Sequence, residues 1–335
     1  MILIIVIFLI IFFCFYLLNN ILKKKINENY QGFFTQDFYD EIDKKNYTID
    51  KDKRIIIYND KIISYNKHFN SDISIINAKD KFITSNLLSK NNIPIPPYLK
   101  IDLSSNVENI QKKIKNANIK YPVVIKPING TFGIDVITDI ETKKELIYTI
   151  NLLKTKYKDA MLEQQISGDC YRIFVFNNNI IDVIKREKPY VIGDNNNTIK
   201  QLIDLRNIEQ KKMDLMEVKN ISEIYIRKQG YNMNSIPSSG EKVYICNVIN
   251  MHNGARISRI PLEKIPQKNI DLFLKVNKVM DIKCSGLDFL SDDITIEYDI
   301  NNGKILEVNG TPDTEIHQKI KNYNFFEKIV DLMFN

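Results

Sequence analysis

The sequence predicts an α+β fold, because strand-like and helix-like stretches follow one another without strict strand–helix–strand order. Its composition agrees, since 44% of the residues are hydrophobic and 26% are charged, as is usual for a globular domain. The first 18 residues differ from the rest because they are apolar and uncharged. We therefore expect a membrane-spanning helix followed by one α+β domain.

The apolar stretch "MILIIVIFLIIFFCFYLL" is long enough to cross a bilayer as a helix. It lacks the basic start and the small-residue cleavage site of a secretory signal, so we expect an uncleaved anchor over residues 1–22. Lysines follow at positions 23 to 25, which predicts that the rest of the chain lies on the cytoplasmic side. Residues 23–52 are polar and predict a tether, and residues 53–335 predict the domain, with a small lead-in over 53–76.

The charge and cysteine content exclude some classes of protein. The 47 basic and 41 acidic residues give a net charge of +6 but are interspersed, whereas a nucleic-acid-binding face is usually a basic cluster. We expect no nucleic-acid partner. The four cysteines form no Cys-x-x-Cys pair, which argues against a disulfide framework or zinc site and fits a reducing compartment. The sequence does not indicate an oligomeric state.

The expected elements follow from periodicity and turn residues. Lys53–Asn66 predicts two short strands, Asp80–Asn92 a helix ended by prolines, and Tyr121–Ile140 two strands joined by a glycine-bearing turn. Further helices are expected at Glu141–Tyr157, Asn197–Met213 and Ile270–Ile282. Further strands are expected at Ala160–Ile166, in a meander over Tyr171–Ile192, and in a hairpin over Cys284–Gly310.

The stretch "ILEVNGTP" places two oxygen donors at a strand end. Glu307 and Asn309 are two residues apart, so in a strand they point to the same face. A turn is one explanation, because Asn-Gly is a strong turn signal. A neighbouring predicted strand, "GLDFL", carries Asp288 among apolar residues, where an unpaired charge would be costly. Three oxygen donors on adjacent strands favour a site for one or two Mg²⁺ ions over a simple turn.

Two other stretches suggest nucleotide binding. In "VVIKPINGTFG", Lys126 ends a strand beside Gly130 and Gly133, and such a turn can hold phosphates through backbone N–H groups and a lysine. In "LEQQISGD", an extended segment and nearby carboxylates could contact an adenine edge and ribose hydroxyls. Taken alone, each stretch is better explained as an ordinary turn or strand end.

Seven motifs in a fixed order resemble the ATP-grasp ligases. The nearest resemblance is to the ATP-grasp module of cyanophycin synthetases and bifunctional glutathione synthetases, and it covers residues 77–318. The motifs are "DKFITSNLLSKNNIPIPPY", "YPVVIKPINGTFG", "LEQQISGDCYRIFVF", "REKPYVIGDNNNTIKQLI", "IPSSGEKVYI", "GLDFLSDDI" and "ILEVNGTPDTEIH". The resemblance implies an ATP-grasp fold, in which two α+β subdomains clasp ATP.

The resemblance also implies roles for individual residues. The ATP phosphates would be held by two lysines and closed over by two glycines of a mobile loop, namely Lys81, Lys126, Gly130 and Gly133. The hinge that receives adenine would be Glu163 to Ile166, including Gln164. The phosphoryl group and substrate would be contacted by Arg172, Arg186 and Asn250, and the metal by Asp288, Glu307 and Asn309.

The activity implied by the resemblance is ATP-dependent ligation of a carboxylate to an amine. An acyl phosphate would form first, and an amine would then attack it to give an amide or peptide bond, with release of ADP and phosphate. The implied cofactors are ATP and Mg²⁺, with Mn²⁺ as an alternative ion, and the implied partner is a small amino acid or peptide. No stretch resembles the Mur-ligase-like or glutamate–cysteine ligase halves of these relatives, so we do not expect either full activity.

Four residues depart from the family pattern. Asp135 and Asp313 stand where glycine is common, Gln164 where lysine is common, and Cys170 where an acidic residue is common, a role that Asp169 could take over. These departures motivate an alternative, a catalytically inactive, membrane-anchored, nucleotide-binding protein. A third reading is kinase-like phosphoryl transfer on the same fold. The retained lysines and metal ligands favour a working ligase.

Overall fold

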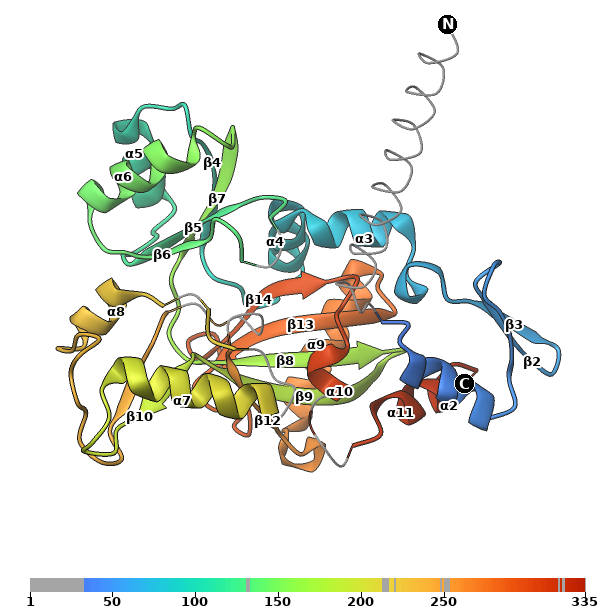
Figure 1. The fold of residues 1–335 in the computed structure, drawn as a ribbon. Coiled ribbons are helices and arrows are strands. Elements are labelled where there is room, and N and C mark those ends of the chain that lie inside the picture. The colour runs from blue at the N-terminus through green and yellow to red at the C-terminus, as the bar shows by residue number, and fades with distance from the viewer. Residues whose placement is uncertain are drawn as a thin grey trace, which may run out of the picture.

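The computed structural model describes residues 33–130, 133–212, 217–219, 221–247, 249, 254–318, 320 and 323–334. Two antiparallel sheets, each with helices of its own, lie one above the other, and a smaller lobe lies beside them (Figure 1). The helices and strands are mixed along the chain without regular alternation. The α+β prediction is therefore confirmed.

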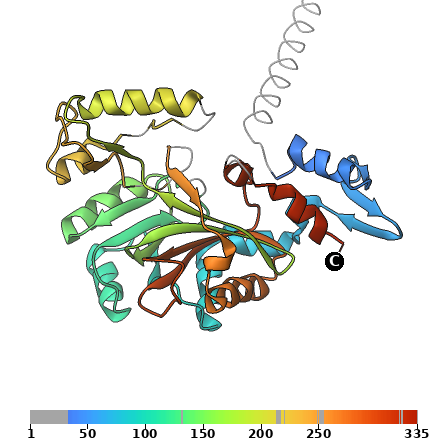
Figure 2. The ribbon, with the colours of Figure 1, turned by 90° about the horizontal axis from the view of Figure 1, so that it is seen from below.

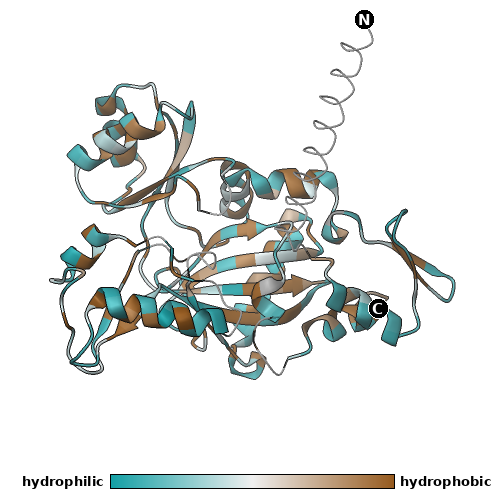
Figure 3. Cartoon of the chain, viewed as in Figure 1, coloured by the Kyte–Doolittle hydropathy of each residue, from teal (hydrophilic) through white to brown (hydrophobic). Residues whose placement is uncertain are grey.

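The central sheet has five strands in the order β12-β9-β8-β13-β14, and every neighbouring pair is antiparallel. These strands are β8 (Asp169–Phe176), β9 (Asn179–Glu187), β12 (Arg256–Arg259), β13 (Cys284–Ser291) and β14 (Gly303–Asn309). The predicted meander and C-terminal hairpin are both present. In Figure 3 these strands carry brown, apolar stretches, as expected for a sheet with covered faces.

One face of the central sheet packs on helices. The apolar side chains of β8, β13 and β14 join α9 and the segment around α4 in one core that includes Ile173, Phe273, Leu287 and Phe289. The helices are α3 (Asp72–Lys79), α4 (Lys81–Lys90) and α9 (Gln267–Met280), and the short η3 (Leu262–Lys264) precedes α9. Asp80 caps α4 by accepting hydrogen bonds from two backbone N–H groups, which places Lys81 at its first position.

The upper sheet has four strands in the order β4-β7-β5-β6 (Figure 1). Its elements are β4 (Tyr98–Asp102), α5 (Val107–Asn116), β5 (Val123–Pro127), β6 (Ile137–Ile140), α6 (Lys143–Leu153) and β7 (Asp159–Gln164). The two helices close its core, and a capping box of Thr142 and Glu145 begins α6. Residues 165–168 alone connect β7 to β8, so this short segment joins the two sheets.

A third lobe follows β9. It consists of β10 (Tyr190–Ile192), α7 (Ile199–Lys212), α8 (Glu223–Lys228) and β11 (Lys242–Tyr244). The two strands pair with each other, and residues such as Val191, Leu202 and Val243 form a separate small core. Figure 2 shows α7 lying along the outer side of this lobe.

The N-terminal part of the described chain packs on the other face of the central sheet. It forms α2 (Gln36–Lys44), β1 (Thr48–Asp50), β2 (Ile55–Tyr58), β3 (Lys61–Ser64) and the short η1 (Asn66–Phe69). Phe33, Phe38 and Ile42 are fully buried there with Phe174 and Phe325. Residues 33–52, which we assigned to a polar tether, therefore belong to the folded domain, because their aromatic side chains complete its core.

Two C-terminal helices cover the same region. They are α10 (Glu315–Gln318) and α11 (Phe325–Leu332), and α11 lies against α2. The buried Asp182 ties α10 to the sheet, because its carboxylate lies 2.8 Å from His317 Nδ1 and accepts a 2.8 Å hydrogen bond from Arg259 Nε. Burial alone would raise the pKa of Asp182, but these two partners outweigh it and hold the pKa below its usual value.

The predicted anchor over residues 1–22 lies outside the described residues. Within the part of the chain that the structure describes, no helix is both long enough and apolar enough to span a bilayer. The anchor therefore stays a prediction from sequence.

We predict that His68 makes stability depend on pH. Burial lowers its pKa from 6.5 to about 4, so the folded protein holds a neutral imidazole where the unfolded chain takes up a proton. Stability should fall as the pH drops from ~6.5 toward ~4, by about 3 kcal/mol in all. Urea unfolding at several pH values should show that the difference in stability between wild type and His68→Phe varies over this range. A constant difference would contradict the assignment.

Candidate active site

A row of charged side chains crosses three strands of the central sheet. Arg172 on β8 pairs in register with Asp288 on β13, which pairs with Glu307 on β14. Register partners point to the same face, so these three side chains lie beside one another. Asn309 lies on the same face, two residues beyond Glu307. Arg186 on β9 joins this face because it pairs with Cys170, two residues before Arg172.

Asp288 lies between two guanidinium groups. Arg172 Nε and Arg186 Nη2 are each 2.8 Å from Asp288 Oδ1, and all three side chains are largely buried. A buried carboxylate is stable only when it is paired, and here two cations share one oxygen. The contacts with Oδ1 are close charge pairs and not well-directed hydrogen bonds, since Oδ1 and both Nε atoms lack a partner of good geometry. Asp288 Oδ1 can therefore still bind a further cation.

Cys170 lies against the same cluster. Its Sγ accepts a 3.0 Å hydrogen bond from Arg186 Nη2. Burial raises the pKa of this thiol, and the neighbouring arginine offsets that effect only in part. Cys170 is therefore a neutral thiol inside the site and supplies no carboxylate in the place where the family pattern has an acid.

The two predicted phosphate lysines approach from other elements. Lys126, at the end of β5, forms a buried ion pair of 2.6 Å with Glu163 on β7. Lys81, at the start of α4, donates a 2.5 Å hydrogen bond to the carbonyl oxygen of Gly130 and lies 3.2 Å from Glu307 Oε1. Lys81 therefore links the glycine-bearing turn of the upper sheet to the charged row of the central sheet.

The turn between β5 and β6 contains the two predicted glycines. Gly133 has a φ of 70°, in the left-handed region that glycine adopts without strain. Asp135, where the family often has glycine, has a φ of 57° and is stabilised by hydrogen bonds from Lys156 Nζ at 2.9 Å and from the Tyr157 hydroxyl at 2.7 Å. These two partners also lower the pKa of Asp135. The departure from glycine is thus compensated by contacts with the residues that follow α6.

The hinge residues are fixed to the upper sheet. The side chain of Gln164 accepts a 3.1 Å hydrogen bond from the backbone N–H of Lys120. Gln165 pairs twice with Asp139 on β6, since its amide accepts from the Asp139 N–H at 2.7 Å and donates to the carboxylate at 2.8 Å. Asn247 also donates to Asp139, which connects this hinge to the segment that follows the third lobe. Ile166 follows directly in the connection to β8.

Asp169 does not join the charged row. It is the first residue of β8, so it points to the face opposite Cys170, and it forms an ion pair with Lys185. Because Asp169 pairs with Lys185 and points away from Cys170, its position does not support the predicted contact with ribose. The remaining predicted residue, Asn250, lies outside the described residues.

Sequence reasoning missed the role of Gly286 and the partner of the hinge residue Gln165. A Cβ atom on Gly286 would lie 2.5 Å from Arg172 Nη1 and 3.1 Å from Pro312 Cβ, so only glycine lets Arg172 lie across β13. A glycine inside an apolar strand is a signal of such close approach, and "CSGLDF" carried it. The pairing of Gln165 with Asp139 had no comparable signal, because it joins side chains 26 positions apart.

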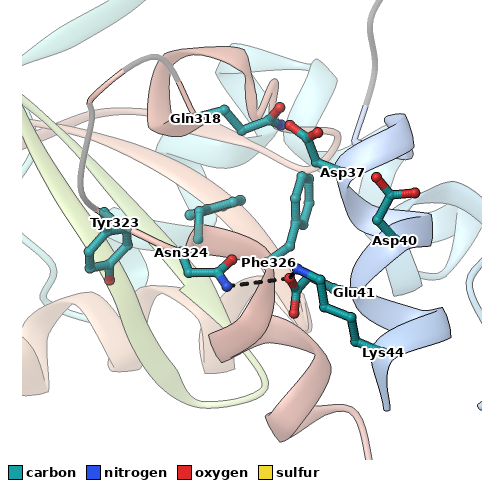
Figure 4. A pocket seen from close by; sticks show the side chains of 9 residues that line it. Asp37, Asp40, Glu41, Lys44, Gln318, Tyr323, Asn324 and Phe326 are labelled. Atoms are coloured by element: carbon teal, nitrogen blue, oxygen red, sulfur yellow. Dashed lines mark hydrogen bonds and ion pairs between the residues drawn. The ribbon is translucent and has the colours of Figure 1, made fainter. Parts of the chain in front are cut away.

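A separate polar pocket of about 230 Å³ lies between α2 and the C-terminal helices (Figure 4). None of the predicted site residues lines it. Its buried acid, Glu41, is already partnered by Lys44 and by the Asn324 side chain. We therefore assign the candidate active site to the charged row and not to this pocket.

Comparison with known proteins agrees with this geometry. Residues 78–204 match the RimK-like ATP-grasp domain family. The cyanophycin synthetase of Synechocystis sp. is 28% identical over 249 residues, which cover 72% of this chain and 28% of that protein. The glutathione biosynthesis bifunctional protein of Clostridium perfringens is 26% identical over 277 residues, or 79% of this chain and 35% of that protein.

A solved structure shares the fold. A crystal structure of a bifunctional glutathione synthetase from Pasteurella multocida matches 89% of this chain and 43% of its own, with a TM-score of 0.60 and 19% identity. Residues 78–204 of this chain therefore carry a RimK-like ATP-grasp domain. The predicted resemblance and the ATP-grasp fold are thus confirmed. The chain spans only about a third of the length of the curated relatives it matches.

We predict that Gly286→Ala will disable the site without unfolding the domain. The added methyl group should push the Arg172 guanidinium off Asp288, which should lower ATP turnover by about 10-fold or more. Its cost in stability should stay within ~1–3 kcal/mol, as for other overpacked sites.

Gly240→Ala is the matched control, because its Cβ would meet no described atom within 4 Å although its φ is 81°. That variant should lose about 1 kcal/mol of stability but keep its turnover. Equal turnover in the two variants, measured by ADP release, would contradict the role given to Gly286.

Proposed function

We propose that this chain is an ATP-dependent carboxylate–amine ligase acting on a small amino acid or peptide. The observation that carries the proposal is the buried Asp288, which lies between Arg172 and Arg186. Asp288 is in register with Glu307, and Glu307 in turn contacts Lys81. Three cations and two carboxylates thus meet where the upper and central sheets are linked, and this arrangement suits a polyphosphate because phosphoryl transfer requires charge neutralisation and positioning.

The proposed reaction has two steps. An oxygen of the substrate carboxylate attacks the γ-phosphorus of ATP, so that an acyl phosphate forms and ADP leaves. The amine then attacks the acyl carbon, phosphate leaves, and the amine loses one proton. Lys81 and Lys126 would hold the ATP phosphates, and Arg172 and Arg186 would bind the transferred phosphoryl group. The site offers cations to an anionic transition state and needs no protein nucleophile.

The residues present fit a Mg²⁺ site. Asp288 Oδ1 is buried without a well-directed hydrogen bond, and Asn309 Nδ2 donates to the Gly286 carbonyl at 3.1 Å, which leaves its amide oxygen for another partner. With Glu307 these form an all-oxygen set of the kind that Mg²⁺ prefers. No group of three or more His, Cys, Asp or Glu side chains that could hold a metal ion is found among the described residues, so the third ligand of this set would have to be the Asn309 amide oxygen. When bound, Mg²⁺ would neutralise charge on the ATP phosphates.

The alternative hypothesis, an inactive nucleotide-binding protein, is weakened at one of the residues that motivated it. Asp135 replaces a family glycine, but Lys156 and Tyr157 stabilise its left-handed backbone. Cys170 remains a departure, and no carboxylate of β8 takes its place in the charged row. Kinase-like transfer would leave a phosphorylated product in place of an amide, so mass spectrometry of the product distinguishes it.

Changing Glu307 to Gln should abolish Mg²⁺-dependent turnover while the fold is kept. The change removes one carboxylate ligand and the partner of Lys81, with nearly the same shape. We expect turnover to fall about 100-fold or more, and the loss should be smaller when Mg²⁺ is raised. Glu297→Gln is the control, because that exposed acid pairs only loosely, at 3.6 Å, with Lys268. Unchanged turnover in Glu307→Gln would remove the metal assignment.

Replacing Arg172 by Lys tests the phosphoryl contact. Lysine keeps the charge beside Asp288 but loses the planar fork that matches phosphate oxygens. We expect turnover to fall about 100-fold, measured as ADP release. Arg259→Lys is a matched control, since Arg259 is equally buried and also lies 2.8 Å from an aspartate, Asp182, outside the charged row. Similar losses in both variants would mean that Arg172 acts only through stability.

We propose further that residues 1–22 anchor the protein in a membrane with the ATP-grasp domain on the cytoplasmic side. The support is the apolar sequence and the lysines that follow it. Deleting Met1 to Leu22 should move the protein from the membrane pellet to the supernatant after alkaline extraction, with ATP binding retained. A deleted chain that stays in the pellet would contradict the proposed anchor.

A further inference from the structure

Three cationic side chains contact Tyr190, namely Lys242 and Arg206 of the third lobe and Arg256 of the central sheet. Tyr190 begins β10 and is only 8% exposed. Lys242 Nζ lies 4.0 Å from the ring centre, and the guanidinium carbon of Arg256 lies 4.3 Å from it. Both distances are within the range of cation–π contacts.

The third cation, Arg206 on α7, is buried. It is 6% exposed, and its Nη1 donates a 3.0 Å hydrogen bond to the Tyr190 carbonyl oxygen, while Nη2 donates to the Gly254 carbonyl oxygen. Burial, together with the charge of Arg256, lowers its pKa from 12.5 to about 10. The two arginines are therefore close enough for the charge of Arg256 to act on Arg206.

This cluster carries more positive than negative charge. Among the residues that the structure describes, no ion pair joins a carboxylate to Arg206 or Arg256, and Glu187 lies 3.6 Å from Lys242. In addition, the Nε of Arg256 is buried and has no hydrogen-bond partner. Buried charged groups are normally paired, because an unpaired one costs free energy. A bound anion would compensate this excess positive charge.

The cluster is distinct from the charged row. On β12, Arg256 pairs in register with Glu187, whereas its neighbour Ile257 pairs with Arg186. Successive residues of a strand point to opposite faces, so Arg256 and Arg186 lie on opposite faces of the sheet. Arg256 therefore does not belong to the charged row of the proposed ATP site.

We propose that Arg256, Arg206 and Lys242 form a second anion-binding site, which takes an oxyanion group, carboxylate or phosphate, of a small ligand beside Tyr190. Arg256 supplies a directed donor, since its Nε has no other partner, and a guanidinium suits both planar and tetrahedral oxyanions. Arg206 contributes positive charge and not a direct contact, because its Nη1 and Nη2 already donate to carbonyl oxygens. This inference goes beyond the proposed ligase activity and does not depend on it.

Tyr190→Trp supplies a local reporter. The chain contains no tryptophan, so this variant carries a single indole, which keeps an aromatic face for the cations. Sodium phosphate and sodium acetate would be titrated separately into the full-length protein, at constant ionic strength set with sodium chloride. We expect a saturable change in emission with at least one of them, and the more effective anion identifies the preferred oxyanion. Magnesium and the ATP analogue AMPPNP are kept present so that the nucleotide site is filled.

Arg256→Gln in the same reporter should weaken the anion by about 10-fold or more, because a charge-assisted donor is lost. Arg227→Gln is the control, since that arginine lies in the third lobe with Tyr190 but is exposed and pairs with Glu223. It should leave the titration unchanged. No saturable response to either anion, or an equal response with Arg256→Gln, would overturn the proposal.

A second measurement avoids the tryptophan substitution. The melting temperature of the unsubstituted chain, again with magnesium and AMPPNP, should rise with the preferred anion, because a ligand that binds only the folded state stabilises it. The rise should be lost in Arg256→Gln and kept in Arg227→Gln. The same rise in both variants would contradict the site even if the reporter fails to fold.

Discussion

The close contact of Asp288 with Arg172 and Arg186 is the interaction on which the site depends. A carboxylate buried in an inner strand of a sheet must be paired, and here the pairing fixes two guanidinium groups on one face. It also requires that β8, β9 and β13 keep their register and that Gly286 carry no side chain. The opposite face is apolar and packs on α9, whereas this face carries the charged row beside the region that α2 and α11 cover.

Much of the site follows from sequence because it rests on strand alternation. The spacing of Glu307 and Asn309 and the apolar surroundings of Asp288 indicated one polar face, and the structure brings these residues together. Alternation cannot say which cation pairs with which carboxylate, since that depends on strand order. The pairing of Lys81 with Glu307 joins residues 226 positions apart, 307 minus 81, and only the tertiary fold determines it. The sequence resemblance supplied the candidates but not their partners.

The sequence was least informative where polar residues serve packing. The charge of residues 33–52 predicted a tether, yet Phe33 and Phe38 are buried in the core on which α11 also packs. A few aromatic side chains outweigh many exposed charges, because each buries a large apolar area. The role of Gln165 was likewise not evident from the sequence. Its pairing with Asp139, which Asn247 also contacts, connects the hinge to the upper sheet and to the segment that follows the third lobe. Motion of the upper sheet over the central one would have to carry these contacts along or break them.

The most direct test of the ligase assignment follows oxygen atoms during turnover. A pool of amino acids and short peptides would be labelled with ¹⁸O in its carboxylates and incubated with the protein, ATP and Mg²⁺, and the released phosphate would be analysed by mass spectrometry. Formation and aminolysis of an acyl phosphate must transfer one carboxylate oxygen to phosphate, so the account predicts singly labelled phosphate that appears together with an amide product. Release of unlabelled phosphate alone, in step with ADP, would mean that water accepts the phosphoryl group and would contradict the account.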